Sequence, residues 1–220
     1  MTTVLSCGSE AESKAREEIV RIGADLYSRR YTVGTAGNIS ARLEDGWLIT
    51  PTDACLGHLE PGAIAKVSSD GQWLSGDKPS KTLVLHRAIY DHNPMVGGVV
   101  HTHSTNLVAL TLAGVWSEEN VLPPITPYQV MKVGRVPFIP YCRPGHPSVA
   151  ERVRELASDV RAVLLDRLGP VVWGATVSQA AWSLEELEET AKLWLMLDPK
   201  PAVMTEQQIE DLRVTFGARW

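Results

Sequence analysis

Residues 97–104 read Gly97-Gly98-Val99-Val100-His101-Thr102-His103-Ser104, an apolar run that ends in two histidines. A continuous apolar run of this kind next to glycines predicts a buried strand, and residues 104–113 after it predict a helix. Residues i and i+2 of a strand point to the same face, so the imidazoles of His101 and His103 can converge on one ligand. The segment therefore predicts a buried strand of an α/β fold and a candidate site at the end of that strand.

The chain on either side of this segment alternates between helical and strand-like patterns. Apolar side chains at a spacing of three to four predict helices, and short apolar runs bounded by turn residues predict strands. We expect helices over residues 9–31, 80–92, 148–157 and 178–197, and strands over 35–42, 46–52, 65–67, 72–74, 136–139, 162–165 and 171–173. The first four strands form two hairpins, Ser80 lies near the expected N-cap of the helix over 80–92, and residues 113–127 form a long loop. Early hairpins followed by interleaved strands and helices predict a layered α/β fold with a mixed or largely antiparallel sheet.

The composition is that of an ordinary globular protein. The 220 residues are 44% hydrophobic and 21% charged, which excludes a disordered chain or a fibre, and we expect one domain over residues 1–220. With 21 Lys and Arg against 26 Asp and Glu the formal net charge is -5, so no nucleic-acid partner is expected. No apolar run reaches the roughly 18 residues of a membrane span, so no membrane partner is expected either. The cysteines Cys7, Cys55 and Cys142 form no CxxC pair and are interpreted as reduced thiols of a cytoplasmic protein.

Three short polar segments are candidates for binding an anion. They are Thr35-Ala36-Gly37-Asn38, Thr50-Pro51-Thr52-Asp53 and Pro79-Ser80-Lys81. Glycine lets the backbone approach a ligand, hydroxyl and amide groups donate to phosphate oxygens, and Lys81 adds a positive charge. Each segment alone is typical of a turn or a helix cap, and an isolated His-X-His pair is typical of two hydrogen-bonded histidines, because a metal needs at least a third ligand. Taken together, the segments predict a phosphate site.

Five segments resemble, in order and spacing, the successive motifs of the class II aldolases of the fuculose-phosphate aldolase and adducin superfamily. They are Gly34-Thr35-Ala36-Gly37-Asn38-Ile39-Ser40, Leu48-Ile49-Thr50-Pro51-Thr52, Lys78-Pro79-Ser80-Lys81, Val99-Val100-His101-Thr102-His103-Ser104 and Gly169-Pro170-Val171-Val172-Trp173-Gly174. Residues 122–128 and 185–192 are most similar to the branch of 3-oxo-tetronate 4-phosphate decarboxylases. The resemblance covers roughly residues 12–215.

This resemblance implies a three-layer α/β/α fold around a central mixed, largely antiparallel sheet. It also implies a homo-oligomer, usually a fourfold tetramer, with active sites at the subunit interfaces. The implied substrate is a small molecule, and the implied cofactor is a divalent metal, with zinc as the expected ion. In the family the metal is held by the two histidines that match His101 and His103, by a third histidine, and often by a glutamate.

The same resemblance assigns substrate-binding and catalytic positions. The residues that match the family's phosphate-binding positions are Asn38, Thr52, Ser80 and Lys81, with Gly37 giving access to the backbone. Tyr128 stands where the family often has a tyrosine that reaches a neighbouring subunit's site, so it is a candidate proton donor. The alternative for Tyr128 is an ordinary interface or core tyrosine.

Two departures from the family pattern limit what can be carried over. Thr82 stands where the family has its catalytic glutamate, and Leu168 stands where it has the third metal-binding histidine. Threonine cannot accept a proton near neutral pH without a base of its own, and leucine cannot coordinate a metal. Metal binding by His101 and His103 would then depend on Asp166, His86 or a bound substrate to complete the shell. For His86 the alternative is packing against the sheet.

The sequence thus favours a divergent carbon–carbon lyase that acts on a small phosphorylated or anionic sugar-derived substrate, most simply by decarboxylation. Loss of carbon dioxide generates the enolate without a base, so the site needs only an electrophile and a proton donor. The electrophile is a metal on the His101 and His103 pair or Lys81 alone, and Tyr128 is the candidate donor. Two alternatives remain open: acid–base chemistry by the histidine pair without a metal, and a non-catalytic binding or assembly protein. The acidic run over residues 185–189 is interpreted as the solvated face of the last long helix.

Overall fold

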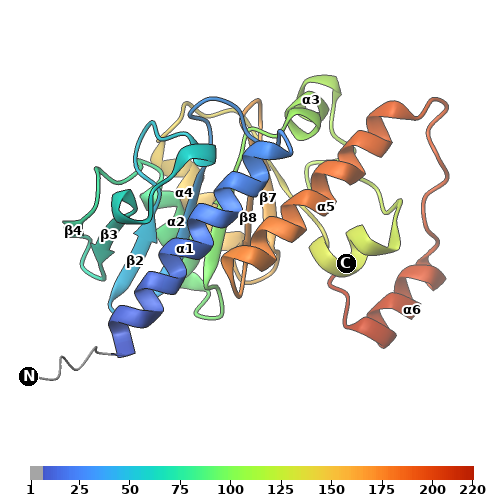
Figure 1. Cartoon of the computed structure of the whole chain (residues 1–220). Helices are drawn as coiled ribbons and strands as arrows, with labels where there is room; N and C mark the ends of the chain where they lie inside the picture. The colour runs from blue at the N-terminus through green and yellow to red at the C-terminus, as the bar shows by residue number, and fades with distance from the viewer. Residues whose placement is uncertain (1–6) are drawn as a thin grey trace, which may run out of the picture.

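The computed structural model describes residues 7–220, with side chains described from Glu10 onward, so the Cys7 side chain lies outside the described part. Within these residues an eight-stranded sheet runs in the order β4-β3-β2-β1-β5-β8-β7-β6 (Figure 1). The strands are β1 (Asn38–Leu43), β2 (Gly46–Ile49), β3 (Ala65–Ser68), β4 (Trp73–Ser75), β5 (Gly98–His101), β6 (Phe138–Ile139), β7 (Ala162–Leu165) and β8 (Gly169–Gly174). Neighbouring strands are antiparallel except β6 and β7, which are parallel. The expected mixed, largely antiparallel sheet and both hairpins are confirmed.

β5 lies in the middle of the sheet, between β1 and β8. All four of its residues are buried, as the apolar run predicts. Val99 packs into the core on one face of the sheet and Val100 into the core on the other. This alternation follows from the period of two in a strand, and it places the end of β5 where elements from both sides of the sheet meet.

Helices cover both faces of the sheet, which gives the expected three layers. They are α1 (Cys7–Ser28), α2 (Leu83–His92), α3 (Thr105–Ala113), α4 (Pro147–Leu156), α5 (Val177–Met196) and α6 (Glu206–Phe216). In Figure 1, α1 and α5 lie in front of the sheet, and α2 and α4 lie behind it. The apolar side chains of α1, α3 and α5 form one core cluster, and those of α2 and α4 form the other. Sequestering apolar surface on both faces is the main force that holds such a layered fold together.

The start of α2 differs from the expected cap at Ser80. The helix begins at Leu83, and its N-cap is Thr82, which makes no side-chain capping bond. Ser80 is held by the sheet instead, because its N–H donates to the carbonyl of Thr50 at 3.2 Å. An adjacent bridge joins Pro51 to Pro79. Ser80 therefore lies two residues before the N-cap, where its hydroxyl accepts from the Thr82 N–H at 3.4 Å.

The later chain follows the expected pattern and ends in a small separate cluster. Residues after α3 form the expected loop, which leads into a single π-helical turn, η3 (Gln129–Val133). α6 begins with a capping box between Thr205 and Gln208 and packs against this turn through Ile209 and Leu212. Over residues 7–220, no helix has the length and apolar character needed to cross a bilayer.

Candidate functional site

The two histidines of the opening segment lie side by side at the end of β5. His101 is the last residue of the strand and is 3% exposed, and His103 follows in the connection to α3. Their ring centroids are 5.1 Å apart in an edge-to-face arrangement. His101 Nδ1 lies 2.7 Å from the carbonyl oxygen of Pro170. A carbonyl can only accept, so Nδ1 carries the proton and Nε2 keeps its lone pair.

Both imidazoles are neutral at pH 7. Burial and, to a smaller extent, the neighbouring His103 lower the pKa of His101 to about 4, and the bond to Pro170 opposes the shift. Burial also lowers the pKa of His103 from its ordinary value. The pair therefore acts through its lone pairs and N–H groups, not as cations.

The three polar segments meet near this end of β5. Asn38 begins β1 and is paired in register with His101. The second and third segments are joined to each other, since the Thr52 N–H donates to the Lys78 carbonyl at 2.9 Å and Ser80 bonds Thr50. Gly37 has a φ of +87°, and a Cβ built there would lie 2.7 Å from the carbonyl oxygen of His101. Glycine is required at that position by both its conformation and this close approach.

A cavity of about 240 Å³ opens beside His101. Lys81 and Asp166 belong to its polar lining. The cavity is also lined by Thr82 and Leu168, the two residues that depart from the family pattern. Apolar side chains of α2, α4, β6 and β7 form most of the remaining wall, for example Leu85, Ala150, Ile139 and Leu165. The two positions at which the sequence departs from the family pattern therefore come together next to the histidine pair.

The donor set at this site does not fit a metal ion. Catalytic zinc takes three protein ligands, and His101 and His103 supply two. His86 cannot be the third, because its Nε2 contacts Asn38 at 2.6 Å and its Nδ1 contacts Ser40 at 2.7 Å. Among the described side chains, no group of three His, Cys, Asp or Glu residues is placed to hold a metal. Of the three possible completions of a metal shell, His86 is therefore ruled out, and the alternative for His86, packing against the sheet, is confirmed by its full burial.

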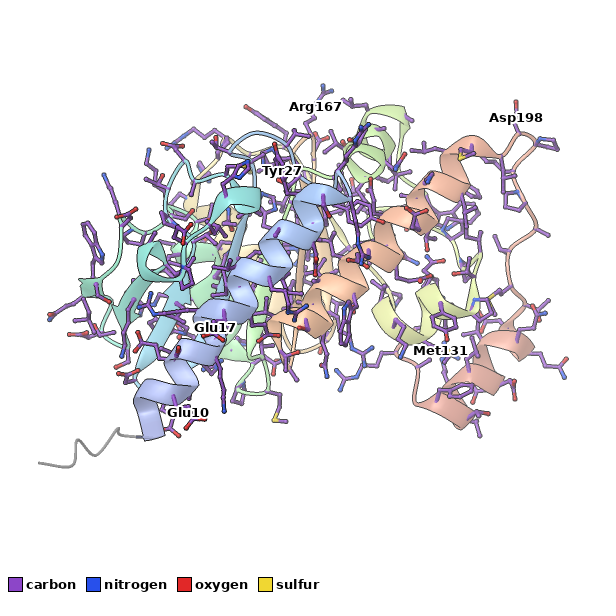
Figure 2. The ribbon with its side chains drawn as sticks, in the orientation of Figure 1. Glu10, Glu17, Tyr27, Met131, Arg167 and Asp198 are labelled. Atoms are coloured by element: carbon purple, nitrogen blue, oxygen red, sulfur yellow. The ribbon has the colours of Figure 1, made fainter. Side chains whose placement is uncertain are left out.

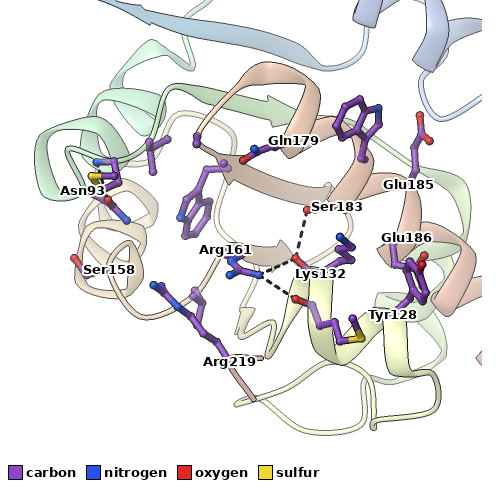
Figure 3. Close-up of a pocket in the computed structure, with 18 residues that line it drawn as sticks. Asn93, Tyr128, Lys132, Ser158, Arg161, Gln179, Ser183, Glu185, Glu186 and Arg219 are labelled. Carbon is purple, nitrogen blue, oxygen red and sulfur yellow. Dashed lines mark hydrogen bonds between the residues drawn. The ribbon is translucent and has the colours of Figure 1, made fainter. Parts of the chain in front are cut away.

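Tyr128 does not lie at the histidine pair within the chain. It is 59% exposed and lines a second cavity of about 910 Å³, together with Arg161, Trp173 and Glu186 (Figure 3). That cavity also includes Gly174, which pairs with Gly98 at the opposite end of β5 from His101.

Side-chain placement agrees with this separation of the two cavities. Arg167 follows Asp166 of the first cavity, Met131 lines the second, and the two lie far apart in Figure 2. The guanidinium of Arg161 donates to the carbonyls of Met131 and Lys132 at 3.2 and 3.1 Å, as Figure 3 shows, and so anchors the turn that follows Tyr128.

Glu188 is a buried site-supporting residue that the sequence interpretation missed. The run over 185–189 was expected to be solvated, but Glu188 is 1% exposed. Its carboxylate accepts from the N–H of Asn106 at 2.8 Å and the N–H of Leu107 at 2.9 Å, at the start of the helix that follows His103. The missed signal is spacing: Glu188 falls on the same apolar stripe of α5 as Leu184, Leu187 and Ala191, which are buried.

The fold and this arrangement define the class of protein. The family model described as class II aldolase and adducin N-terminal domain matches residues 17–195. The chain therefore belongs to the class II aldolase and adducin family, and the expected family membership and fold are confirmed. Class II aldolases typically depend on a divalent metal, which the described residues of this chain do not suffice to hold.

Its relatives point to one branch of that family. The chain is 66% identical over 214 residues to the 3-oxo-tetronate 4-phosphate decarboxylase of Cupriavidus necator, covering 95% of this chain and 99% of the relative. It is 47% identical to the enzyme of the same name from Escherichia coli K12, with 93% and 98% covered. The crystal structure of YgbL from Escherichia coli, an aldolase, epimerase or decarboxylase candidate, superposes with a TM-score of 0.88 at 47% identity, covering 92% of this chain and 99% of that one. The named relatives are carbon–carbon lyases, as expected from the sequence.

Proposed function

We propose that this chain decarboxylates a small phosphorylated 3-oxo sugar acid, the substrate class named for its 3-oxo-tetronate 4-phosphate decarboxylase relatives. One observation carries the proposal: the polar segments that contain Asn38 and Ser80 converge on the end of β5 that carries the histidine pair. Thr82 takes the place of a general base beside the cavity. A site of this kind can bind a phosphorylated acid, and it suits a reaction that removes no proton from carbon.

The phosphate end of the substrate is assigned to the polar segments. The residues are Gly37, Asn38, Thr52, Ser80 and Lys81. Amide and hydroxyl groups donate to phosphate oxygens, and the exposed Lys81 ammonium supplies charge. Gly37 contributes because, without a side chain, its backbone can lie against the end of β5 next to His101.

The bond that breaks joins the carboxylate carbon to the adjacent carbon of the substrate. Its electron pair passes to that carbon and is delocalised onto the 3-oxo oxygen as an enolate, carbon dioxide leaves, and the carbon then takes up a proton. Lys81 and a neutral His103 N–H supply hydrogen-bond donors for the developing oxyanion. His101 Nε2, with its lone pair, is available to accept from a substrate hydroxyl.

The proton donor in this proposal is Tyr128 of a neighbouring copy of the chain. Within one chain Tyr128 lies at the other cavity, so this role requires a homo-oligomer, for which the fourfold tetramer stays the prediction. A cytoplasmic location also stays a prediction.

The proposed reaction uses no metal ion, because the described residues offer two imidazoles and no third ligand. This same observation favours a second candidate function, a protein that binds the phosphorylated acid without turning it over. Acid–base chemistry by His101 and His103 without a metal is a variant of the first proposal.

The test is carbon dioxide release from 3-oxo-tetronate 4-phosphate by the purified protein. We expect turnover, and a KM that rises at least about tenfold when Ser80→Ala and Lys81→Ala are combined, because charge-assisted hydrogen bonds to phosphate are lost. Lys14→Ala is the control, since Lys14 is an exposed lysine on α1. Substrate binding without carbon dioxide release would favour the binding protein, and an unchanged KM in the double variant would refute the phosphate assignment.

Elemental analysis tests the donor set separately. We expect the wild type to hold less than one metal ion per chain and the Thr82→Glu, Leu168→His variant to gain one, because a carboxylate and an imidazole then join His101 and His103. Stoichiometric metal in the wild type that is lost on His101→Ala with His103→Ala would show that ligands from elsewhere complete the site.

A further inference from the structure

Four buried polar side chains form a continuous hydrogen-bonded row behind the proposed phosphate site. His86 Nε2 lies 2.6 Å from Asn38 Oδ1, and His86 Nδ1 lies 2.7 Å from the hydroxyl of Ser40. The Ser40 hydroxyl lies 2.7 Å from that of Tyr90. Asn38 is 6% exposed and the other three are at most 1% exposed, so the row is screened from water except at its Asn38 end.

The protons in this row can be assigned from one end to the other. Asn38 Oδ1 only accepts, so His86 Nε2 carries the ring proton and donates it. The neutral ring then has a lone pair at Nδ1, which accepts from Ser40. The Ser40 oxygen in turn accepts from Tyr90. Burial, with a smaller contribution from nearby His101, lowers the pKa of His86 to about 3, so the ring is neutral at pH 7 and the assignment is consistent.

The Asn38 amide points its oxygen at His86 and its nitrogen away from it. With Oδ1 bound to His86, the amide nitrogen Nδ2 has no partner among the described residues. This nitrogen is also not sealed in the interior. Among the described residues, Trp47 Nε1 is the side-chain atom that is both fully buried and without a hydrogen-bond partner, and Asn38 Nδ2 is not such an atom. The opposite tautomer of His86 would bind Nδ2 and turn the carbonyl oxygen toward the site, where it would repel an anion.

We propose that His86 is a positioning residue that fixes the Asn38 amide with its N–H groups toward the substrate phosphate. The inference rests on the proposed phosphate site. Ser40 and Tyr90 support this role, because Ser40 donates to His86 Nδ1 and Tyr90 donates to Ser40, which keeps Nδ1 an acceptor. These three neutral side chains thereby fix which end of the Asn38 amide faces the phosphate. The function of the row is specificity for an anion, beyond its contribution to packing.

Two substitutions at position 86 separate positioning from packing. The amide nitrogen of glutamine reaches about as far as Nε2 and can donate to Asn38, and the amide oxygen of asparagine reaches about as far as Nδ1 and can accept from Ser40. His86→Gln therefore keeps the bond to Asn38 and loses the one to Ser40, while His86→Asn does the reverse. Affinity for inorganic phosphate is measured by titration calorimetry for the wild type, both variants and Ser80→Ala, with a thermal melt of each.

We expect His86→Gln to bind phosphate within about threefold of the wild type and His86→Asn to bind about tenfold or more weakly, the effect of losing one hydrogen bond to a charged group. Equal losses in the two variants, with Ser80→Ala still weakening binding, would overturn the positioning role and leave the phosphate site standing. If Ser80→Ala did not weaken binding, the phosphate site itself would be wrong, and the inference would fall with it.

A spectroscopic measurement keeps the proposal testable if a variant does not fold. Proton–nitrogen correlation spectra of the wild type, with labelled histidine, report which ring nitrogen of His86 carries the proton. We expect the Nε2–H tautomer. The Nδ1–H tautomer would turn the Asn38 carbonyl toward the site and overturn the proposal.

Discussion

Replacing Glu188 by glutamine tests how the helix after the histidine pair is held. The Glu188 carboxylate accepts three bonds: from the N–H and the side-chain amide of Asn106 at 2.8 and 2.9 Å, and from the N–H of Leu107 at 2.9 Å. The two Asn106 bonds share Oε1, and the Leu107 bond uses Oε2. A glutamine oxygen can replace Oε1, but its NH₂ group would then face the Leu107 N–H, donor against donor.

The cost follows from that one mismatch. A lost charge-assisted bond that leaves a buried N–H without an acceptor costs about 1.5–3 kcal/mol. Removing the buried negative charge offsets part of this cost. Burial disfavours the charged carboxylate, and it is the largest cause that raises the pKa of Glu188. We expect Glu188→Gln to lower the free energy of unfolding by about 2 kcal/mol, or Tm by roughly 4–8 °C for a chain of this size.

The assay is urea unfolding of the wild type, Glu188→Gln and Glu189→Gln. Glu189 is the matched control, since it lies next along α5 in an exposed ion pair with Lys192 and should change stability by less than about 0.5 kcal/mol. Equal stability of wild type and Glu188→Gln at pH 7 would refute the reasoning.

Three further predictions concern other buried groups. Burial lowers the pKa of His86 to about 3 and that of His101 to about 4. The contribution of each histidine to stability is therefore complete above about pH 6.5 and is lost as pH falls toward the folded pKa, at up to about 1.4 kcal/mol per pH unit. Unfolding free energies measured at several pH values should show this slope, and His86→Gln should reduce the slope. Trp47→Phe should lower the unfolding free energy by about 1–2 kcal/mol, because the smaller ring loses core packing against Tyr90 and Arg87, whereas the buried Trp47 N–H makes no hydrogen bond to lose; a loss of about 3 kcal/mol or more would reveal a partner of that N–H. Gly37→Ala should cost about 2 kcal/mol and weaken phosphate binding, since its Cβ would lie 2.7 Å from the His101 carbonyl at a φ of +87°; a melt and a phosphate titration equal to wild type would contradict the assigned close approach.

Much of the framework follows from the sequence alone, because it depends on short-range pattern. The buried strand before His101 and both hairpins were each predicted from a few adjacent residues, and the structure confirms them. Apolar residues recur every three to four positions in an amphipathic helix and every second position in a half-buried strand, so their spacing distinguishes helix from strand locally. The proximity of the two imidazoles also follows from their spacing in sequence.

Tertiary structure decided what each polar side chain contacts. His86 bonds Asn38, 48 positions away, and Glu188 bonds Asn106, 82 positions away, so no local pattern reveals either pairing. The same holds for Thr82 and Leu168, which meet in one cavity, and for Tyr128, which faces another. Burying a polar group is costly unless a partner is in place, and that partner is supplied by whichever strand or helix the packed layers bring alongside. Local sequence therefore determined the elements and the candidate donors, whereas the packing of distant elements determined which donors are free to bind a substrate.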